Sequence, residues 1–208
     1  MPELSTPELE KRMRPGAWSM AGFLGPNESL DAVLRLDAEA MTLLGVTHRR
    51  IADTLEQAIV SGIKAEEKVI SFRASRRSAA QTEPAKKFNF LQNIFTRAKA
   101  DHTAPMIEVR ANPLEEESVR CGFPFEHLRY SGMRYPGYQE CPWGCGDCPG
   151  SDLDFRIENE RAGEVVEGPG LIVHLIREHQ FFEGLESPYR VHPVKLVKLL
   201  ELGPEFSS

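Results

Sequence analysis

The chain has 208 residues, of which 41% are hydrophobic and 27% charged, a composition that indicates a soluble globular protein and disfavours global disorder. The formal net charge of -6 opposes dedicated nucleic-acid binding, because phosphate contacts require a basic surface. The first residues lack the pattern of a secretory signal, and no apolar run approaches the roughly 20 residues that span a bilayer. We therefore expect a cytoplasmic protein with no membrane contact.

The first 63 residues are predicted to form an N-terminal arm and a helical hairpin. Residues 1–26 are rich in Pro and Gly, and we expect this arm to pack Trp18 and Phe23 against the body of the protein. Apolar residues then recur at helical spacing from position 28 to Gly45, and Thr47 is a suitable cap for a second helix. The short connection between these two helices favours a helical hairpin.

The junction between these two helices resembles the helix-turn-helix of DNA-binding regulators, with Gly45 in the turn. His48, Arg49 and Arg50 would then lie in the first turn of the recognition helix. Gly45 is equally suited to end a helix as its C-cap, because glycine readily adopts the left-handed conformation. The acidic composition favours the structural hairpin, and a DNA-binding regulator remains the alternative.

Residues 64–104 are predicted to be a basic linker or insertion. The stretch 64–101 contains nine Lys or Arg against four acidic residues. Apolar residues at helical spacing between Phe88 and Ala98 predict a short helix within it. Nucleic acid could bind here, but a charged run usually forms solvated surface, and we favour that interpretation.

Residues 105–208 are predicted to form an α+β metal-binding domain. Alternating patterns predict strands at 106–110 and 154–158, with a returning strand at 164–166. A nearly apolar helix is expected over 171–179, and Pro193 is placed to begin a last helix. The predicted fold is therefore α+β: an N-terminal helical hairpin, then a small antiparallel sheet and helices around a zinc-finger-like site.

The cysteines and histidines of this last region predict a zinc site. Cys145 and Cys148 form a Cys-x2-Cys turn, and His174 and His179 supply a second pair of ligands. Structural zinc takes four Cys or His ligands in a tetrahedron, commonly as such a turn plus a distant pair. The order of elements resembles a ββα zinc finger, although the stretch between the pairs is about twice as long. Both histidines reach one metal only if the helix end is distorted, since residues five apart differ by about 140° around the axis.

Cys141 is a fifth candidate ligand. With Cys145 it resembles a zinc knuckle with one added residue, so a three-cysteine, one-histidine site is the second possibility. The spacing of Cys141, Cys145 and Cys148 resembles that of radical S-adenosylmethionine enzymes, but the chain that follows is too short for their barrel. An isolated iron–sulfur cluster and a redox-active Cys145–Cys148 pair remain open. Cys121 is expected to be a buried residue rather than a ligand.

The evidence for an enzyme is thin. The sequence contains no Gly-rich phosphate loop, nucleophile elbow or kinase signature. Glu178 beside His179 invites comparison with His-x2-Glu-His metalloproteases, but the spacing here is His-x3-Glu-His. We therefore expect a structural zinc site in a binding or scaffold module with a protein partner. A metal-dependent hydrolase with an open zinc position is the alternative.

Overall fold

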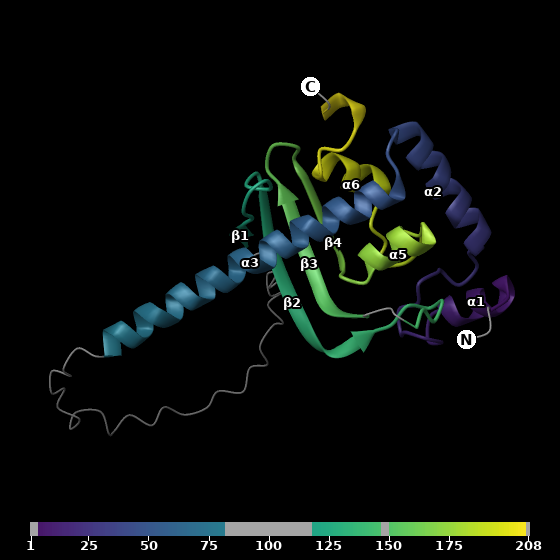
Figure 1. The fold of residues 1–208 in the computed structure, drawn as a ribbon. Helices are drawn as coiled ribbons and strands as arrows, with labels where there is room; N and C mark the ends of the chain where they lie inside the picture. Colours follow the sequence, from purple (N-terminus) through teal and green to yellow (C-terminus); the bar gives the residue numbers. More distant parts are fainter. Residues whose placement is uncertain (1–3, 82–117, 147–149, 207–208) are drawn as a thin grey trace, which may run out of the picture.

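In a computed structural model, the chain is described for residues 4–81, 118–146 and 150–206. The helices are α1 (Thr6–Met13), α2 (Leu30–Leu44), α3 (His48–Gln81), α5 (Ile172–His179) and α6 (Pro193–Leu199), followed by a 3-10 turn, η1 (Pro204–Phe206) (Figure 1). The strands are β1 (Val119–Arg120), β2 (Leu128–Gln139), β3 (Ser151–Asn159) and β4 (Glu164–Pro169). They form one antiparallel sheet in the order β1-β2-β3-β4.

The long helix α3 crosses the sheet and packs against β2 and β1 (Figure 1). Its contact with β2 is close, because the Tyr130 ring lies directly against Gly62 and leaves no room for a Cβ atom there. Along β3, Phe155 and Ile157 are fully buried, whereas Asp154 is only half-buried. This alternation is the period of two expected for a strand with one face in the core.

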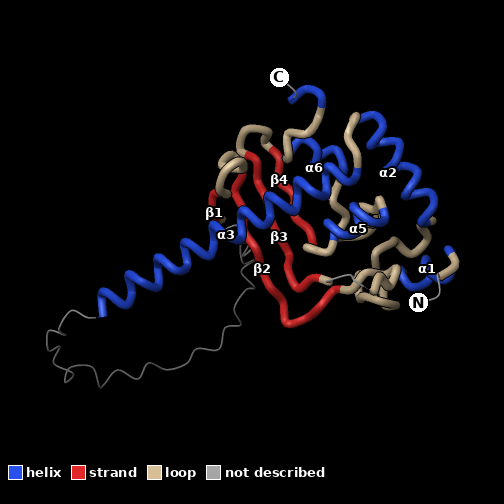
Figure 2. The backbone as a smooth tube through the Cα atoms, viewed as in Figure 1, coloured by secondary structure: helices blue, strands red, loops and turns tan. Residues whose placement is uncertain are grey.

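The shorter helices complete the core on either side of α3. Helix α5 packs against α3, while α6 packs against β4, β3 and α2. In Figure 2 the four strands are drawn as red tubes that lie next to one another. None of the helices in the described ranges has the length and apolarity needed to cross a bilayer.

The α+β fold with an antiparallel sheet is as predicted from the sequence. The expected strands at 154–158 and 164–166 lie within β3 and β4, and the helices over 171–179 and from Pro193 are present as α5 and α6. Packing of α2 and α3 as a hairpin is not confirmed, because α2 packs on α6. Gly45 is the C-cap of α2. It has the left-handed conformation that this role favours, with φ of 64°.

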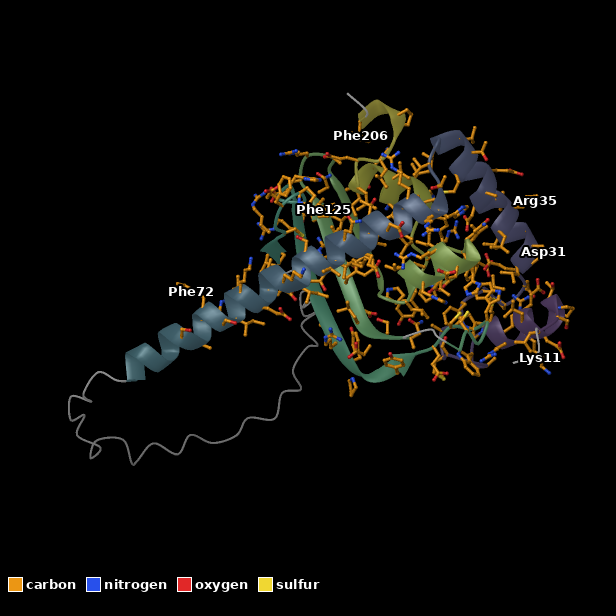
Figure 3. All side chains as sticks on the ribbon, viewed as in Figure 1. Lys11, Asp31, Arg35, Phe72, Phe125 and Phe206 are labelled. Carbon is orange, nitrogen blue, oxygen red and sulfur yellow. The ribbon has the colours of Figure 1, made fainter. Side chains whose placement is uncertain are left out.

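Three features differ from the expectation or lie outside it. The N-terminal arm contains a helix, α1, and it buries Phe23 but leaves Trp18 42% exposed. Helix α3 continues past position 64 to Gln81, and its second half projects from the body, with Phe72 64% exposed (Figure 3). The predicted helix around 88–98 and strand at 106–110 lie outside the described residues, and the division into domains remains a prediction.

Candidate metal centre

A tight turn after β2 brings two cysteines together. The Gly144 N–H donates a hydrogen bond to the Cys141 carbonyl at 2.9 Å, which closes the turn. Gly144 has φ of 75°, a conformation that glycine adopts without the steric cost of a Cβ atom. The turn places the Cys141 Sγ 3.7 Å from the Cys145 Sγ, with Cys141 buried and Cys145 half-buried.

Helix α5 carries the two histidines. It ends at His179, and Gln180 follows in the left-handed conformation, with φ of 55°. The Gln180 N–H donates to the Ile176 carbonyl at 3.2 Å, the bond of an αL helix end, and the Phe181 N–H donates to the Leu175 carbonyl at 3.1 Å. The rings of His174 and His179 converge in spite of their offset around the helix, with centroids 5.2 Å apart and an interplanar angle of 70°.

The four side chains point their donor atoms at one place. The Nε2 of His179 lies 3.3 Å from each of the two cysteine sulfurs. One donor atom from each of Cys141, Cys145, His174 and His179 lies within 4.8 Å of all the others. In a zinc tetrahedron with the usual bond lengths, sulfurs lie about 3.8 Å apart and a sulfur lies about 3.6 Å from a nitrogen. The sulfur–sulfur separation of 3.7 Å matches that geometry, and the two sulfur–nitrogen separations of 3.3 Å are slightly shorter.

The two sulfurs do not form a disulfide. Their 3.7 Å separation far exceeds the bond length of about 2.05 Å, and both cysteines are free thiols. The two sulfurs and the His179 Nε2 lie close together in a mostly apolar environment. One shared cation would satisfy these three polar atoms better than weak thiol hydrogen bonds.

The electrostatics of the site suit neutral imidazole ligands. Burial, with a smaller contribution from nearby His174, lowers the pKa of His179 to about 4. Burial likewise lowers the pKa of His174, whose Nε2 is buried without a hydrogen-bond partner. Both rings are therefore unprotonated at neutral pH, the state that can coordinate a metal.

The same burial acts in the opposite sense on the thiols. It raises the pKa of Cys141 to about 12, although the backbone N–H groups of Trp143 and Cys145 oppose this by hydrogen bonding to the sulfur. A bound cation reverses this preference for the protonated thiol, since a thiol that coordinates a metal is deprotonated. The amides are thus already placed to stabilise a thiolate.

The surroundings of the site contact one ligand directly and anchor the helix that carries both histidines. The indole of Trp143 stacks on the His179 ring, and Phe181 meets the indole edge-on with centroids 5.4 Å apart. On the far side of α5, Arg177 donates to Asp53 at 3.0 Å and to Glu56 at 2.7 Å, both on α3. These contacts hold the helix that carries the histidines against the main helix of the fold.

The structure brings together four of the five ligands predicted from the sequence: Cys141, Cys145, His174 and His179. The fifth, Cys148, lies outside the described residues. Cys121 is buried, as predicted, with its sulfur 3.9 Å from the Ala58 carbonyl, and it is not part of the cluster. Glu178 is exposed and does not belong to the cluster either.

The sequence does not single out the residues around the ligands. The partners of Arg177 lie more than 100 positions earlier in the chain, so no local pattern reveals them. Trp143 could have been singled out, because an aromatic residue inside a cysteine turn is placed to cover the ligands. In the predicted recognition helix, His48 turns inward with its ring 5.6 Å from Phe182, and its Nε2 is buried.

Comparison with known proteins found no matching protein-family model, no matching curated protein and no matching solved structure.

Proposed function

We propose that this protein binds one zinc ion through Cys141, Cys145, His174 and His179. The observation that carries the proposal is the convergence of two sulfurs and two imidazoles, with one donor atom of each side chain within 4.8 Å of the others. A tetrahedral set of two sulfur and two nitrogen donors favours zinc among the common metals. Two thiolates also neutralise the charge of the ion, which suits a partly buried site.

The proposed role of the ion is structural. A catalytic zinc keeps one position for water, whereas four protein donors complete the tetrahedron. The ion would join the loop after β2 to the end of α5, two segments that are otherwise linked chiefly by the Trp143 stack. This arrangement favours a structural site over the metal-dependent hydrolase considered from the sequence.

We further propose that the protein acts as a binding or scaffold module for a protein partner in the cytoplasm, where reduced thiols persist. The alternative of a DNA-binding regulator is not favoured. His48 packs on Phe182, and the exposed Arg49 lies 3.7 Å from Asp53, so two of the three first-turn residues already have contacts within the protein.

Elemental analysis of the purified full chain tests the proposal. We expect about one zinc per chain. Cys145→Ser and His179→Ala should each lose most of this metal, and Cys121→Ser, the matched control, should retain it. A chain that holds no stoichiometric metal, or ligand variants that keep it with unchanged stability, would contradict the proposal.

A further inference from the structure

A groove of about 670 Å³ lies beside the metal loop. It is formed by the N-terminal arm, the end of β2, the start of β3 and the loop before α6. Four aromatic residues line it and remain accessible, with exposed fractions of 42% for Trp18, 47% for Tyr135, 64% for Tyr138 and 42% for Tyr189. Exposed aromatic rings gathered around one hollow are unusual unless the hollow binds something.

The groove is also acidic. Asp152 and Asp154 alternate with Leu153 along β3, so both carboxylates lie on one face of the strand. Glu140 adds a third carboxylate, and no Lys or Arg is among the described residues that line the groove. Asp152 is paired with Arg134 at 2.6 Å. Within the described part of the chain, no hydrogen bond or ion pair is made by the Asp154 carboxylate.

Asp154 lies close to the tyrosines. Its negative charge and the neighbouring Tyr189 both raise the pKa of Tyr135, after the larger effect of burial. Burial also raises the pKa of Asp154 itself, as expected for a half-buried carboxylate without a counter-ion. The unpaired carboxylate therefore faces a surface of aromatic rings.

The shape of the groove is fixed by glycine at one wall. The Tyr138 ring packs directly against Gly150, where a Cβ atom would collide with it, and Gly150 has φ of 54°. In the N-terminal arm, the guanidinium carbon of Arg12 lies 3.4 Å from the centroid of the Trp18 ring. One face of this indole thus already holds a cation.

We propose that this groove binds a small organic cation carrying a substituted ammonium group. Aromatic faces attract cations through the ring quadrupole, and a set of several rings with a carboxylate is the arrangement that selects quaternary ammonium ligands. The volume lies within the range of small-molecule sites. A carboxylate among aromatic rings would repel an anion and would gain little from a neutral compound, so charge decides the class of ligand.

This site is separate from the proposed zinc site, since none of the four metal ligands lines the groove. The two proposals therefore fail independently: metal content tests one, and ligand binding by the metal-containing protein tests the other. Glu140 immediately precedes Cys141, so the groove and the metal loop are adjacent in the chain.

Isothermal titration of the purified full chain with choline tests the inference, with 3,3-dimethylbutanol as the uncharged isostere. We expect choline to bind about tenfold more tightly than the isostere, which corresponds to about 1.4 kcal/mol and lies within the range of cation–π contacts. Asp154→Asn and Tyr135→Leu should each weaken choline binding at least about fivefold. Asp31→Asn, an exposed acidic position on α2 outside the groove (Figure 3), should leave binding unchanged.

Two results with the parent protein would overturn the inference: no choline binding up to about 10 mM, or equal binding of choline and its isostere. Unchanged choline affinity in Asp154→Asn would do the same. Zinc content and circular dichroism of each variant show whether it is folded, and Asp154→Asn keeps the test decisive if Tyr135→Leu does not fold.

Discussion

The indole ring of Trp143 lies parallel to the imidazole ring of His179, with centroids 3.9 Å apart and an interplanar angle of 4°. Trp143 belongs to the cysteine turn and His179 to the end of α5, so this stack joins the two halves of the candidate metal centre. The half-buried indole also covers the imidazole from solvent. Contacts of this kind fix the orientation of a ligand before the metal binds.

Replacing Trp143 should therefore weaken metal binding without removing a ligand. We expect Trp143→Leu to lower the zinc affinity about tenfold, the lower end of the range for residues that support metal ligands. Trp143→Phe keeps an aromatic ring and should lose less. Competition with a chromophoric chelator measures both affinities, and a leucine variant as tight as the parent would show that the stack does not orient His179.

Arg177 should stabilise the fold without affecting the metal. Its guanidinium bridges Asp53 and Glu56, and the three side chains are 23%, 44% and 54% exposed. Because pairs this exposed are screened by water, we expect Arg177→Ala to lower the free energy of unfolding by only about 1 kcal/mol. Arg177→Lys should recover part of this, since it keeps the charge but not the fork geometry.

Urea unfolding of the metal-containing protein measures these differences, and the zinc content should stay at the parental value in both variants. A large loss of metal in a folded Arg177→Ala protein would instead place Arg177 among the residues that organise the site.

Glu183 should make stability depend on pH. The residue is fully buried, and burial raises the pKa of its carboxyl group to about 7, even though Ser187 and Arg190 act to lower it. The folded protein thus holds this proton more tightly than the unfolded chain. The associated stability is complete below pH about 4.5 and is lost as the pH rises to about 7.

Glu183→Gln removes this titration. We expect the variant to gain stability relative to the parent as the pH increases from 5 to 8, by at most roughly 3 kcal/mol. Ser187→Ala removes the hydroxyl that donates to the carboxylate at 2.5 Å and lowers its pKa, so the decline of stability should continue to higher pH in this variant. Urea unfolding at a series of pH values gives all three curves, and parallel curves for parent and glutamine variant would refute the assignment.

Cys148 provides a test of the ligand set. The sequence pairs it with Cys145, whereas the described residues place Cys141 in the cluster beside Cys145. We expect Cys148→Ser to retain about one zinc per chain and Cys141→Ser to lose it. The reverse result would assign the site to the Cys-x2-Cys turn, and loss in both variants would indicate a three-cysteine site.

The sequence was informative where a short pattern determines the structure. Alternation identified the strand around Ile157, and proline at the first turn marked the start of α6. The ligand types and spacings likewise singled out Cys141, Cys145, His174 and His179, whose donor atoms lie close together in the structure, while their binding of a metal stays a prediction.

Features that depend on contacts between distant parts of the chain could not be predicted from short sequence patterns. Strand β2 was missed, because its second half is exposed and contains Pro136 and Gly137, which usually end a strand. The choice of Cys141 depends on how the turn at Gly144 aims its sulfur, which spacing does not encode. Arg177 and its partners on α3 are separated by more than 100 residues, so only the folded chain reveals the pairing.

X-ray absorption at the zinc edge of the purified protein is the most direct test of the proposed metal centre. The account predicts two sulfur ligands at about 2.3 Å and two imidazole nitrogens at about 2.0–2.1 Å, with no light atom from water in the first shell. Three or four sulfur ligands, or an oxygen ligand in an open position, would contradict it.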